Sequence, residues 1–329
     1  MEMHFFTPIF LKKVLSMSRN TGFPDVFLDR LGQIVPAEAL SGVLASMAAD
    51  PGLGFRVNTL RCTTAHVLAD IPCPVSPLAW INTGFAVAPE HRKALLESAA
   101  FAKGWIWVQN PSSMVPPLVL NPAQSDVVLD LAAAPGSKTL QLACAMGPGA
   151  DIAAVEMVKP RFYRLKRNLS GQGAAFVKTF NRDGTTVPLY RSDHFDCVLI
   201  DAPCSTEGQM RPDTPASYGH WSERKVKTMA GKQRRLLESA VRCAKPGGAI
   251  VYSTCSYAPE ENEAVVQHAL DTFGEALEVE PIELELPTRT PPLTTWRGQD
   301  FDPAVSNAMR VLPDGTFEAF FVCRLRKAT

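Results

Sequence analysis

Two short segments of the sequence each place a cysteine directly after an apolar run: DAPCS at residues 201–205 and STCSY at residues 253–257. Each apolar run predicts a buried strand, so Cys204 and Cys255 are expected at strand ends, among polar and turn residues. If the two strands are neighbours in a sheet, both thiols face one cleft. A cysteine whose pKa is lowered is a strong nucleophile.

Methylation of carbon 5 of a pyrimidine requires such a nucleophile. The carbon is unreactive until a thiolate adds at carbon 6, and a base must later remove the proton from carbon 5 so that the thiolate can leave. Two thiols and the carboxylate of Asp201 fit these needs. One cysteine would attack and the other would help release the product, but the spacing does not say which thiol has which role.

Acidic residues end the other apolar runs of the same region. The run 126–132 leads into the turn AAAPGSKT, which holds one glycine, Gly136, whereas a pyrophosphate site needs several. Glu156 ends the next run, where it could accept hydrogen bonds from two ribose hydroxyls, and Asp183 after the third could meet an adenine amino group. These residues predict a nucleoside ligand with a neutral or cationic linker, as in S-adenosylmethionine, and disfavour a nucleotide-dependent oxidoreductase.

Strands and helices must alternate to bring these residues to one edge of a sheet. Apolar runs predict strands, and the stretches that follow Pro160 and Trp221 predict helices; the runs are 126–132, 150–156, 174–184, 195–203 and 247–256. Near-continuous apolar strands alternating with helices predict an α/β fold with a doubly wound parallel sheet. In such sheets ligands bind at the carboxyl ends of the strands.

The first third of the chain has a different pattern. Residues 1–22 are expected to form a tail. Helix-period spacing over 23–49, divided by Pro36, predicts two helices, and the alternating segment 54–62 predicts a strand. We therefore expect a small N-terminal α+β domain at 23–108 and an α/β domain at 109–329.

The composition excludes several classes of protein. With 46% hydrophobic and 20% charged residues the chain can bury a sizeable core. Its eight cysteines include no C-x-x-C pair, which argues against a zinc ribbon, a metal site and a disulfide scaffold. Neither a good signal peptide nor an uninterrupted membrane-length apolar run occurs, so we expect a cytoplasmic monomer with reduced thiols and no membrane partner.

Charge is distributed unevenly along a chain whose formal net charge is zero. Residues 159–245 hold 17 Lys/Arg against 8 Asp/Glu, and residues 256–303 hold 11 Asp/Glu against two Arg. One interpretation is chance asymmetry on solvated helices; the other is a basic face beside an acidic lobe, suited to a polyanion. On the second, phosphates would contact Arg161, Arg164, Lys166, Arg167, Arg211, Arg224, Lys225, Lys227, Arg234 and Arg235.

The motifs together resemble a known family. The segments DLAAAPGSKT (130–139), DAPCS, KPGG (245–248), VYSTCS (251–256) and EENE (260–263) resemble those of the Sun/Fmu (RsmB/RsmF/NSUN-type) RNA cytosine-5 methyltransferases. The resemblance covers nearly the whole chain from residue 23, including RVNTL (56–60) and the segment 310–327. It implies a class I (Rossmann-like) methyltransferase fold with a small N-terminal RNA-binding domain, and S-adenosylmethionine as the methyl donor.

Motif position also implies individual roles. Cys255 is the implied nucleophile, Cys204 promotes deprotonation and release, and Asp201 holds the protonated edge of the cytosine ring. The implied cofactor-binding residues are Ala132, Ala133, Ala134, Pro135, Gly136, Ser137, Lys138, Glu156, Arg161, Asp183 and Asp201. We expect a cytosine in structured RNA as substrate, in 16S rRNA. The alternatives are tRNA and, disfavoured by the intact cysteine pair, a non-catalytic RNA-binding or ribosome-assembly factor.

The chain departs from the family pattern in four places. The first turn lacks a cysteine and a second glycine common in relatives, and STEG (205–208) replaces SGEG or SGTG, so the bulkier Thr206 lines that loop. FEAFF (317–321) replaces the usual GFF ending. The sequence stops at Thr329, and we expect the C-terminal extension of RsmF-type enzymes, which often selects the RNA, to be missing.

Overall fold

The computed structural model describes residues 22–329, so all but the last residue of the predicted tail lies outside the described range. The α-helices are α2 (Asp25–Ile34), α3 (Ala37–Ala48), α4 (Thr64–Asp70), α5 (Arg92–Leu96), α6 (Ala99–Ala102), α7 (Pro111–Leu120), α8 (Ser137–Met146), α9 (Lys159–Gly171), α10 (Glu223–Cys243) and α11 (Glu263–Phe273). The short 3-10 helices are η1 (Pro89–His91), η2 (Gly184–Leu189), η3 (Glu207–Gln209), η4 (Pro215–Ser217), η5 (Gly274–Ala276) and η6 (Pro303–Asn307).

The strands are β1 (Leu53–Val57), β2 (Ser76–Pro77), β3 (Gly84–Val87), β4 (Ile106–Val108), β5 (Val127–Asp130), β6 (Asp151–Val155), β7 (Lys178–Phe180), β8 (Phe195–Asp201), β9 (Ala244–Thr254), β10 (Leu277–Glu280), β11 (Arg289–Thr290), β12 (Thr295–Trp296), β13 (Gln299–Asp300), β14 (Met309–Val311) and β15 (Phe320–Lys327). All five strands predicted for the α/β region are present. The run 174–184 yields only the short β7, and the segment predicted as a helix or helix pair from residue 221 is the single helix α10.

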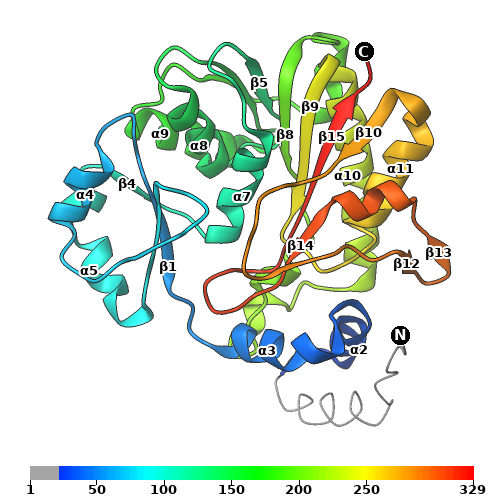
Figure 1. Ribbon diagram of the computed structural model, residues 1–329, viewed down its shortest axis with the longest axis horizontal. Helices are drawn as coiled ribbons and strands as arrows, with labels where there is room; N and C mark the ends of the chain where they lie inside the picture. Colours follow the sequence, from blue (N-terminus) through cyan, green and yellow to red (C-terminus); the bar gives the residue numbers. More distant parts are fainter. Residues whose placement is uncertain (1–21) are drawn as a thin grey trace.

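A nine-stranded mixed sheet forms the centre of the molecule (Figure 1). Its order is β11-β14-β15-β9-β8-β5-β6-β7, with β10 paired to β15. Strands β7, β6, β5, β8 and β9 are parallel, whereas β15 runs antiparallel to β9. The strand order reverses at β5: β6 and β7 lie on one side of it, and β8 and β9 lie on the other. In open α/β sheets ligands bind at such a point, in the crevice at the carboxyl ends of the strands. The predicted doubly wound α/β sheet is confirmed.

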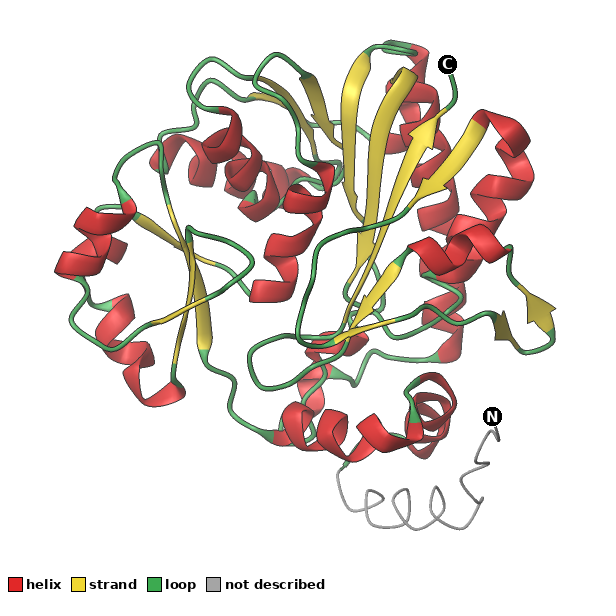
Figure 2. Cartoon of the chain, viewed as in Figure 1, coloured by secondary structure: helices red, strands yellow, loops and turns green. Residues whose placement is uncertain are grey.

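Two hydrophobic cores lie on the two faces of this sheet. Along β8, Val198 and Ile200 point into one core and Cys197 and Leu199 into the other, because side chains alternate along a strand. Helices α10 and α11 cover the first face, and α7, α8 and α9 cover the second. The colouring by secondary structure shows the sheet between these helical layers (Figure 2).

The N-terminal segment is shared between two cores. The antiparallel sheet β2-β3-β1-β4 has a core of its own, which includes Phe55 and Ile106. Helices α2 and α3, divided at Pro36 as predicted, instead pack into the core of the large sheet through residues such as Phe27 and Leu31. The predicted boundary at 108 falls between β4 and α7, and the division into domains at 23–108 and 109–329 stays a prediction.

The predicted basic face is divided between the two faces of the sheet. Arg161, Arg164, Lys166 and Arg167 lie on α9, whereas the other helical basic residues lie on α10, across the sheet. Several carboxylates of the predicted acidic lobe are internal: Glu261 and Glu263 are fully buried. The negative charge counted over residues 256–303 therefore includes buried carboxylates as well as surface ones. Within residues 22–329 no helix has both the length and the apolarity that a membrane crossing requires.

A buried arginine fastens helix α2 to the body of the protein. The Arg30 side chain, 4% exposed, donates to Glu260 (2.7 Å) and Glu223 (3.0 Å) and lies over the Trp296 ring. Arg30→Met should lower the free energy of unfolding by about 3 kcal/mol, because Glu260 is left in a largely buried place without its partner. Urea denaturation measures this.

The matched control is Arg92→Met, which removes an exposed pair with Asp50. That change should cost no more than about 1 kcal/mol, because water screens such pairs. Equal losses in the two variants would show that Arg30 does not anchor α2.

Candidate active site

The predicted site residues lie at the carboxyl ends of the parallel strands. Asp201 is the last residue of β8, and Cys255 directly follows β9. Glu156 directly follows β6, and Asp183 lies three residues beyond β7. Because these strands are neighbours, one edge of the sheet carries both the acidic residues and the thiols.

The turn of residues 132–138 is held by helix α9. Arg161 donates to the carbonyl of Ala134 (2.7 Å), and Asn168 donates to that of Pro135 (2.8 Å). Two features favour glycine at position 136. Its φ is +112°, which L side chains rarely adopt, and a Cβ there would lie 3.1 Å from Leu165 Cδ1. The turn thus passes close to α9, and its residues 132–136 are alanine, proline and glycine.

One carboxylate oxygen of Glu156 and one of Asp183 accept no hydrogen bond from the residues that the structure describes. Glu156 is 5% exposed; its Oε1 accepts from the amide of Val158 (2.8 Å), and its Oε2 lies 3.7 Å from Arg161 Nε. Asp183 is the N-cap of η2, and its Oδ1 accepts from the amide and the hydroxyl of Thr185. Its Oδ2 has no hydrogen-bond partner in the described part of the chain. Both acids are therefore positioned by their own chain segments.

Lys138 belongs to the thiol side of the site. Its Nζ donates to Asp201 Oδ2 (2.6 Å) and Ser113 Oγ (2.8 Å), and its side chain is 7% exposed. Ser137 faces the N-terminal unit, since its Oγ accepts from Trp107 Nε1 (3.0 Å). The structure therefore places these two residues of the predicted cofactor loop away from Glu156, and it joins Lys138 to Asp201.

The two thiols meet at the end of the β8–β9 pair. Cys204 Sγ and Cys255 Sγ are 3.2 Å apart, and both residues are partly exposed. The contact with Cys204 is the first cause that raises the pKa of the Cys255 thiol well above its ordinary value, followed by burial and the charges of Asp201 and Glu318. These causes favour the protonated form of the Cys255 thiol.

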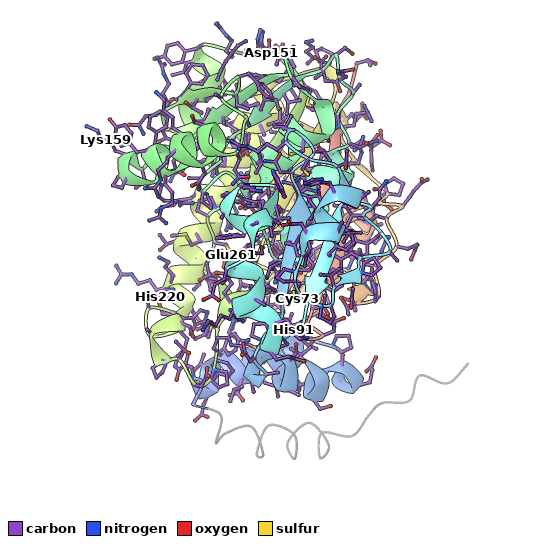
Figure 3. All side chains as sticks on the ribbon, turned by 90° about the vertical axis from the view of Figure 1, so that its left-hand side faces the viewer. Cys73, His91, Asp151, Lys159, His220 and Glu261 are labelled. Carbon is purple, nitrogen blue, oxygen red and sulfur yellow. The ribbon has the colours of Figure 1, made fainter. Side chains whose placement is uncertain are left out.

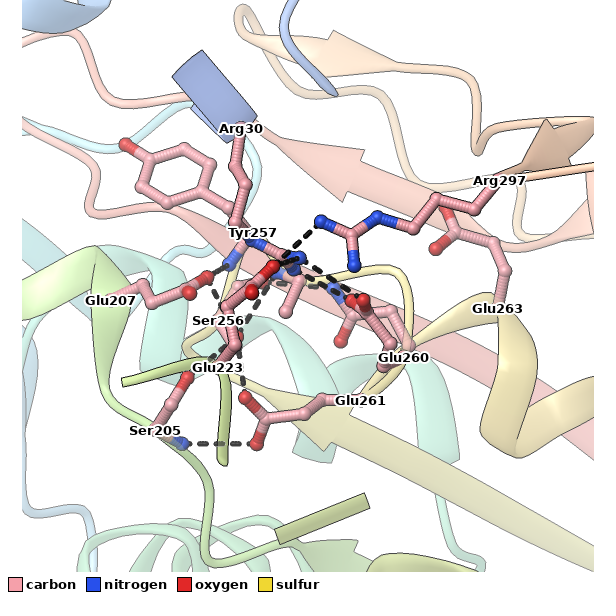
Figure 4. Close-up of polar contacts among 12 residues, drawn as sticks. Arg30, Ser205, Glu207, Glu223, Ser256, Tyr257, Glu260, Glu261, Glu263 and Arg297 are labelled. Atoms are coloured by element: carbon pink, nitrogen blue, oxygen red, sulfur yellow. Dashed lines mark hydrogen bonds and ion pairs between the residues drawn. The ribbon is translucent and has the colours of Figure 1, made fainter. Parts of the chain in front are cut away.

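The segment 260–263, EENE, supports the loop that carries Cys255 (Figure 4). Asn262 bridges it, accepting from Thr254 Oγ1 (2.6 Å) and donating to the carbonyl of Ser256 (2.9 Å). Glu263 forms a buried two-point pair with Arg310, which also donates to the carbonyl of Tyr257 (2.9 Å). The sequence indicates this segment only through the family resemblance. Its structural role could not be predicted, because its contacts come from distant parts of the chain.

Other residues of the site were also missed. Ser113 from α7 and Glu207 from the loop after Cys204 both contact the site, and neither belongs to a pattern that reveals this. A separate hollow of about 360 Å³ lies against β5, β6 and β7 and is lined by Phe180, Tyr190 and Phe195, among others. None of the predicted site residues lines it, so it is distinct from this site.

The fold and site together define a class of protein. A parallel sheet in this order, extended by antiparallel β15 and ending in Glu156 and Asp183 beside a short turn, is the class I methyltransferase fold. A crystal structure of a methyltransferase homolog from Pyrococcus horikoshii superposes with TM-score 0.80 at 32% identity over 98% of this chain and 100% of that chain. NSun6 of the same organism, solved with SFG, has TM-score 0.79 at 19% identity, over 94% and 99% of the two chains, and shows the fold alone.

The sequence comparisons narrow the class to a family. The family described as 16S rRNA methyltransferase RsmB/F matches residues 117–326. The ribosomal RNA small subunit methyltransferase F of Vibrio campbellii is 35% identical over 320 residues, which are 95% of this chain and 65% of that protein. The chain belongs to the RsmB/F methyltransferase family, whose members depend on S-adenosylmethionine, and it spans slightly less than two thirds of the length of this curated relative.

The closeness of the two sulfurs predicts the reactivity of Cys255. In Cys204→Ala the first cause of its raised pKa is gone, so more Cys255 is thiolate at a given pH. Alkylation of Cys255 by iodoacetamide at pH 8, followed by peptide mass spectrometry, should become about tenfold faster. The rate at partly exposed Cys62 should not change. An unchanged rate at Cys255 would contradict the assignment.

Thr206 predicts a stability change in the loop after Cys204. It has φ +61°, a left-handed conformation that disfavours β-branched residues. Thr206→Gly should raise the free energy of unfolding by about 1 kcal/mol, measured by urea denaturation.

Gly208→Ala, two residues on, supplies the contrast. Its Cβ would lie 2.6 Å from the carbonyl oxygen of Ala319, so this variant should be destabilised. Destabilisation by Thr206→Gly as well would mean that the loop does not hold the left-handed conformation.

Proposed function

We propose that this protein transfers a methyl group from S-adenosylmethionine to carbon 5 of a cytosine in ribosomal RNA, through a covalent bond to Cys255. The observation that carries the proposal is the pair of sulfurs 3.2 Å apart, at the ends of adjacent parallel strands, beside the ion pair of Lys138 and Asp201. Membership of the RsmB/F family and the name of the Vibrio relative support rRNA as the substrate.

The residues of the crevice fit S-adenosylmethionine. Glu156 Oε2 and Asp183 Oδ2 are available to accept hydrogen bonds from ribose hydroxyls and an adenine amino group, and the turn 132–136 has small side chains that leave room for the ligand. Asp130, 1% exposed, has one carboxylate oxygen without a partner in the described range. The bound cofactor would supply an electrophilic methyl group, and Arg161 would hold the turn in place.

Cys255 would form the first bond of the reaction. Its sulfur would add to carbon 6 of the cytosine as the thiol proton passes to ring nitrogen 3, so the ring gains no net charge. Asp201 would accept the hydrogen bond from the protonated nitrogen, and the hydrogen bond from Lys138 orients the Asp201 carboxylate. The electron-rich carbon 5 then accepts the methyl group.

Cys204 would complete the reaction. Its sulfur, after giving its own proton to solvent, would take the proton from carbon 5; the electron pair of that bond re-forms the ring double bond as the bond between carbon 6 and Cys255 breaks, and nitrogen 3 returns its proton to the Cys255 sulfur. The distance of 3.2 Å between the sulfurs supports this division of roles, because both thiols would reach the same substrate ring. The base must leave the RNA stack to enter such a site, and the basic residues of α9 and α10 would contact phosphates around it.

A covalent trap tests the proposal. Cys204→Ala lacks the base, so incubation with S-adenosylmethionine and total cellular RNA should give a protein–RNA adduct that survives a denaturing gel. Sequencing the attached RNA should return small-subunit rRNA. The double variant Cys204→Ala/Cys255→Ala, matched in every other respect, should give none.

The other outcomes separate the alternatives. If the attached RNA is tRNA, the substrate is tRNA and not rRNA, and the proposed chemistry is unchanged. An adduct from Cys255→Ala alone would exchange the roles of the two thiols. Absence of an adduct, together with no methylation of any RNA fraction by the unaltered protein, would contradict the enzymatic proposal and favour an assembly factor.

A further inference from the structure

A buried hydroxyl lies between two buried carboxylates directly beneath the thiols. Ser256 Oγ is 3.0 Å from Glu207 Oε2 and 3.0 Å from Glu261 Oε1 (Figure 4). The exposed fractions of these residues are 2%, 1% and 0%. Figure 3 shows Glu261 within the molecule, whereas Lys159 projects from its surface. Two negative charges on either side of one hydroxyl, without water, would be costly.

Counting hydrogens requires that one of the two acids be protonated. A hydroxyl donates one hydrogen and accepts two. Ser256 Oγ has one hydrogen to give and two further neighbours besides the carboxylates: the amide of Ala258 donates to it (3.1 Å), and Ser205 Oγ lies 3.0 Å away. It can therefore donate to only one carboxylate, and the other must donate to it.

The surrounding donors identify the protonated acid. Both oxygens of Glu207 accept N–H bonds, from Trp221 Nε1 (2.8 Å) and the amide of Tyr257 (2.9 Å). Glu261 Oε2 likewise accepts from the amide of Ser205 (2.9 Å) and from the Gln233 side chain. Glu261 Oε1 has Ser256 Oγ as its one partner among the described residues, so the proton belongs there.

We propose that neutral Glu261 donates to Ser256, which donates to ionised Glu207, and that this clamp fixes the two cysteine loops relative to each other. Ser205 follows Cys204 and Ser256 follows Cys255, so the clamp is one residue from each thiol. Their hydroxyls are 3.0 Å apart. Glu207 and Glu261 are thus positioning residues for the proposed methyl transfer, and this inference rests on that function.

The charges around the clamp agree with this proton distribution. Burial is the largest cause that raises the pKa of Glu261 to about 7; the neighbouring charge of Glu207 also raises it, and the hydrogen bonds from Ser205 and Gln233 lower it. The phenol of Tyr252 donates to the backbone carbonyl of Glu261, and Ser205 and Gln233 are neutral. The charge of Arg30 lowers the pKa of Glu207, but burial is the larger effect and raises it. Above about pH 7 Glu261 ionises, and the clamp loses its donor.

Two neutral replacements separate positioning from charge. In Glu261→Gln the amide N–H can replace the acid proton at Ser256, while its carbonyl still accepts from Ser205. In Glu261→Ala both contacts are lost. We expect kcat of the glutamine variant within about twofold of the unaltered enzyme, and kcat of the alanine variant reduced about 100-fold with KM little changed, because the reacting groups are misplaced.

A second readout does not depend on methylation. Diamide converts two adjacent thiols to a disulfide and takes up their two hydrogens. Peptide mapping should show the Cys204–Cys255 disulfide forming at similar rates in unaltered protein and Glu261→Gln, and at least about tenfold more slowly in Glu261→Ala, since oxidation needs the sulfurs in contact. Glu275→Ala, an exposed acid, is the control and should change nothing.

The pH dependence of stability tests the proton itself. A raised folded-state pKa gives Glu261 a stabilising contribution that is complete below the unfolded value near 4.5 and is lost as pH rises to about 7. The Tm difference between Glu261→Gln and the unaltered protein should therefore increase in favour of the variant between pH 5 and pH 8. A constant difference, or a glutamine variant that oxidises as slowly as the alanine variant, would overturn the clamp. If the disulfide and Tm results hold but no variant methylates RNA, the clamp stands and the proposed function fails.

Discussion

The register between two parallel strands determines the geometry of the site. Asp201 pairs with Ser253 across β8 and β9, and the amide of Ala202 donates to the carbonyl of Ser253 (2.9 Å). Cys204 and Cys255 follow within three residues, so the two chains bring their sulfurs together as they leave the sheet. A shift of one residue would turn every side chain of one strand to the other face and separate the thiols.

Placing the thiols in this way requires that many polar groups be buried and compensated. Arg30 and Arg310 neutralise Glu260 and Glu263, and Lys138 pairs with Asp201. Each pair joins the segments around the two cysteines to a distant element: α2, β14 or α8. The stability of the fold and the geometry of the site are therefore coupled, because a buried charge without its partner costs several kcal/mol.

Periodicity and strand-end positions identified the sheet, the acids at its carboxyl edge and the cysteine pair. These features depend on local pattern, which sequence contains directly. The direction of Lys138, the packing of α2 and the burial of Glu261 were not predictable in the same way. Each depends on residues far apart in the chain, as when Glu261 meets Ser205 and Gln233. The segment 256–303 was interpreted as an acidic surface because the count of charges does not distinguish buried from exposed ones.

The central claim is that Cys255, and not Cys204, bonds to carbon 6 of a cytosine. A 16S rRNA transcript made with 5-fluorocytidine tests it most directly in the unaltered protein with S-adenosylmethionine. Fluorine at carbon 5 cannot leave as a proton, so the reaction should stop at the methylated covalent stage. Peptide mass spectrometry should then find the pyrimidine on Cys255. A pyrimidine on Cys204, or no attachment despite methylation of ordinary rRNA, would contradict the account.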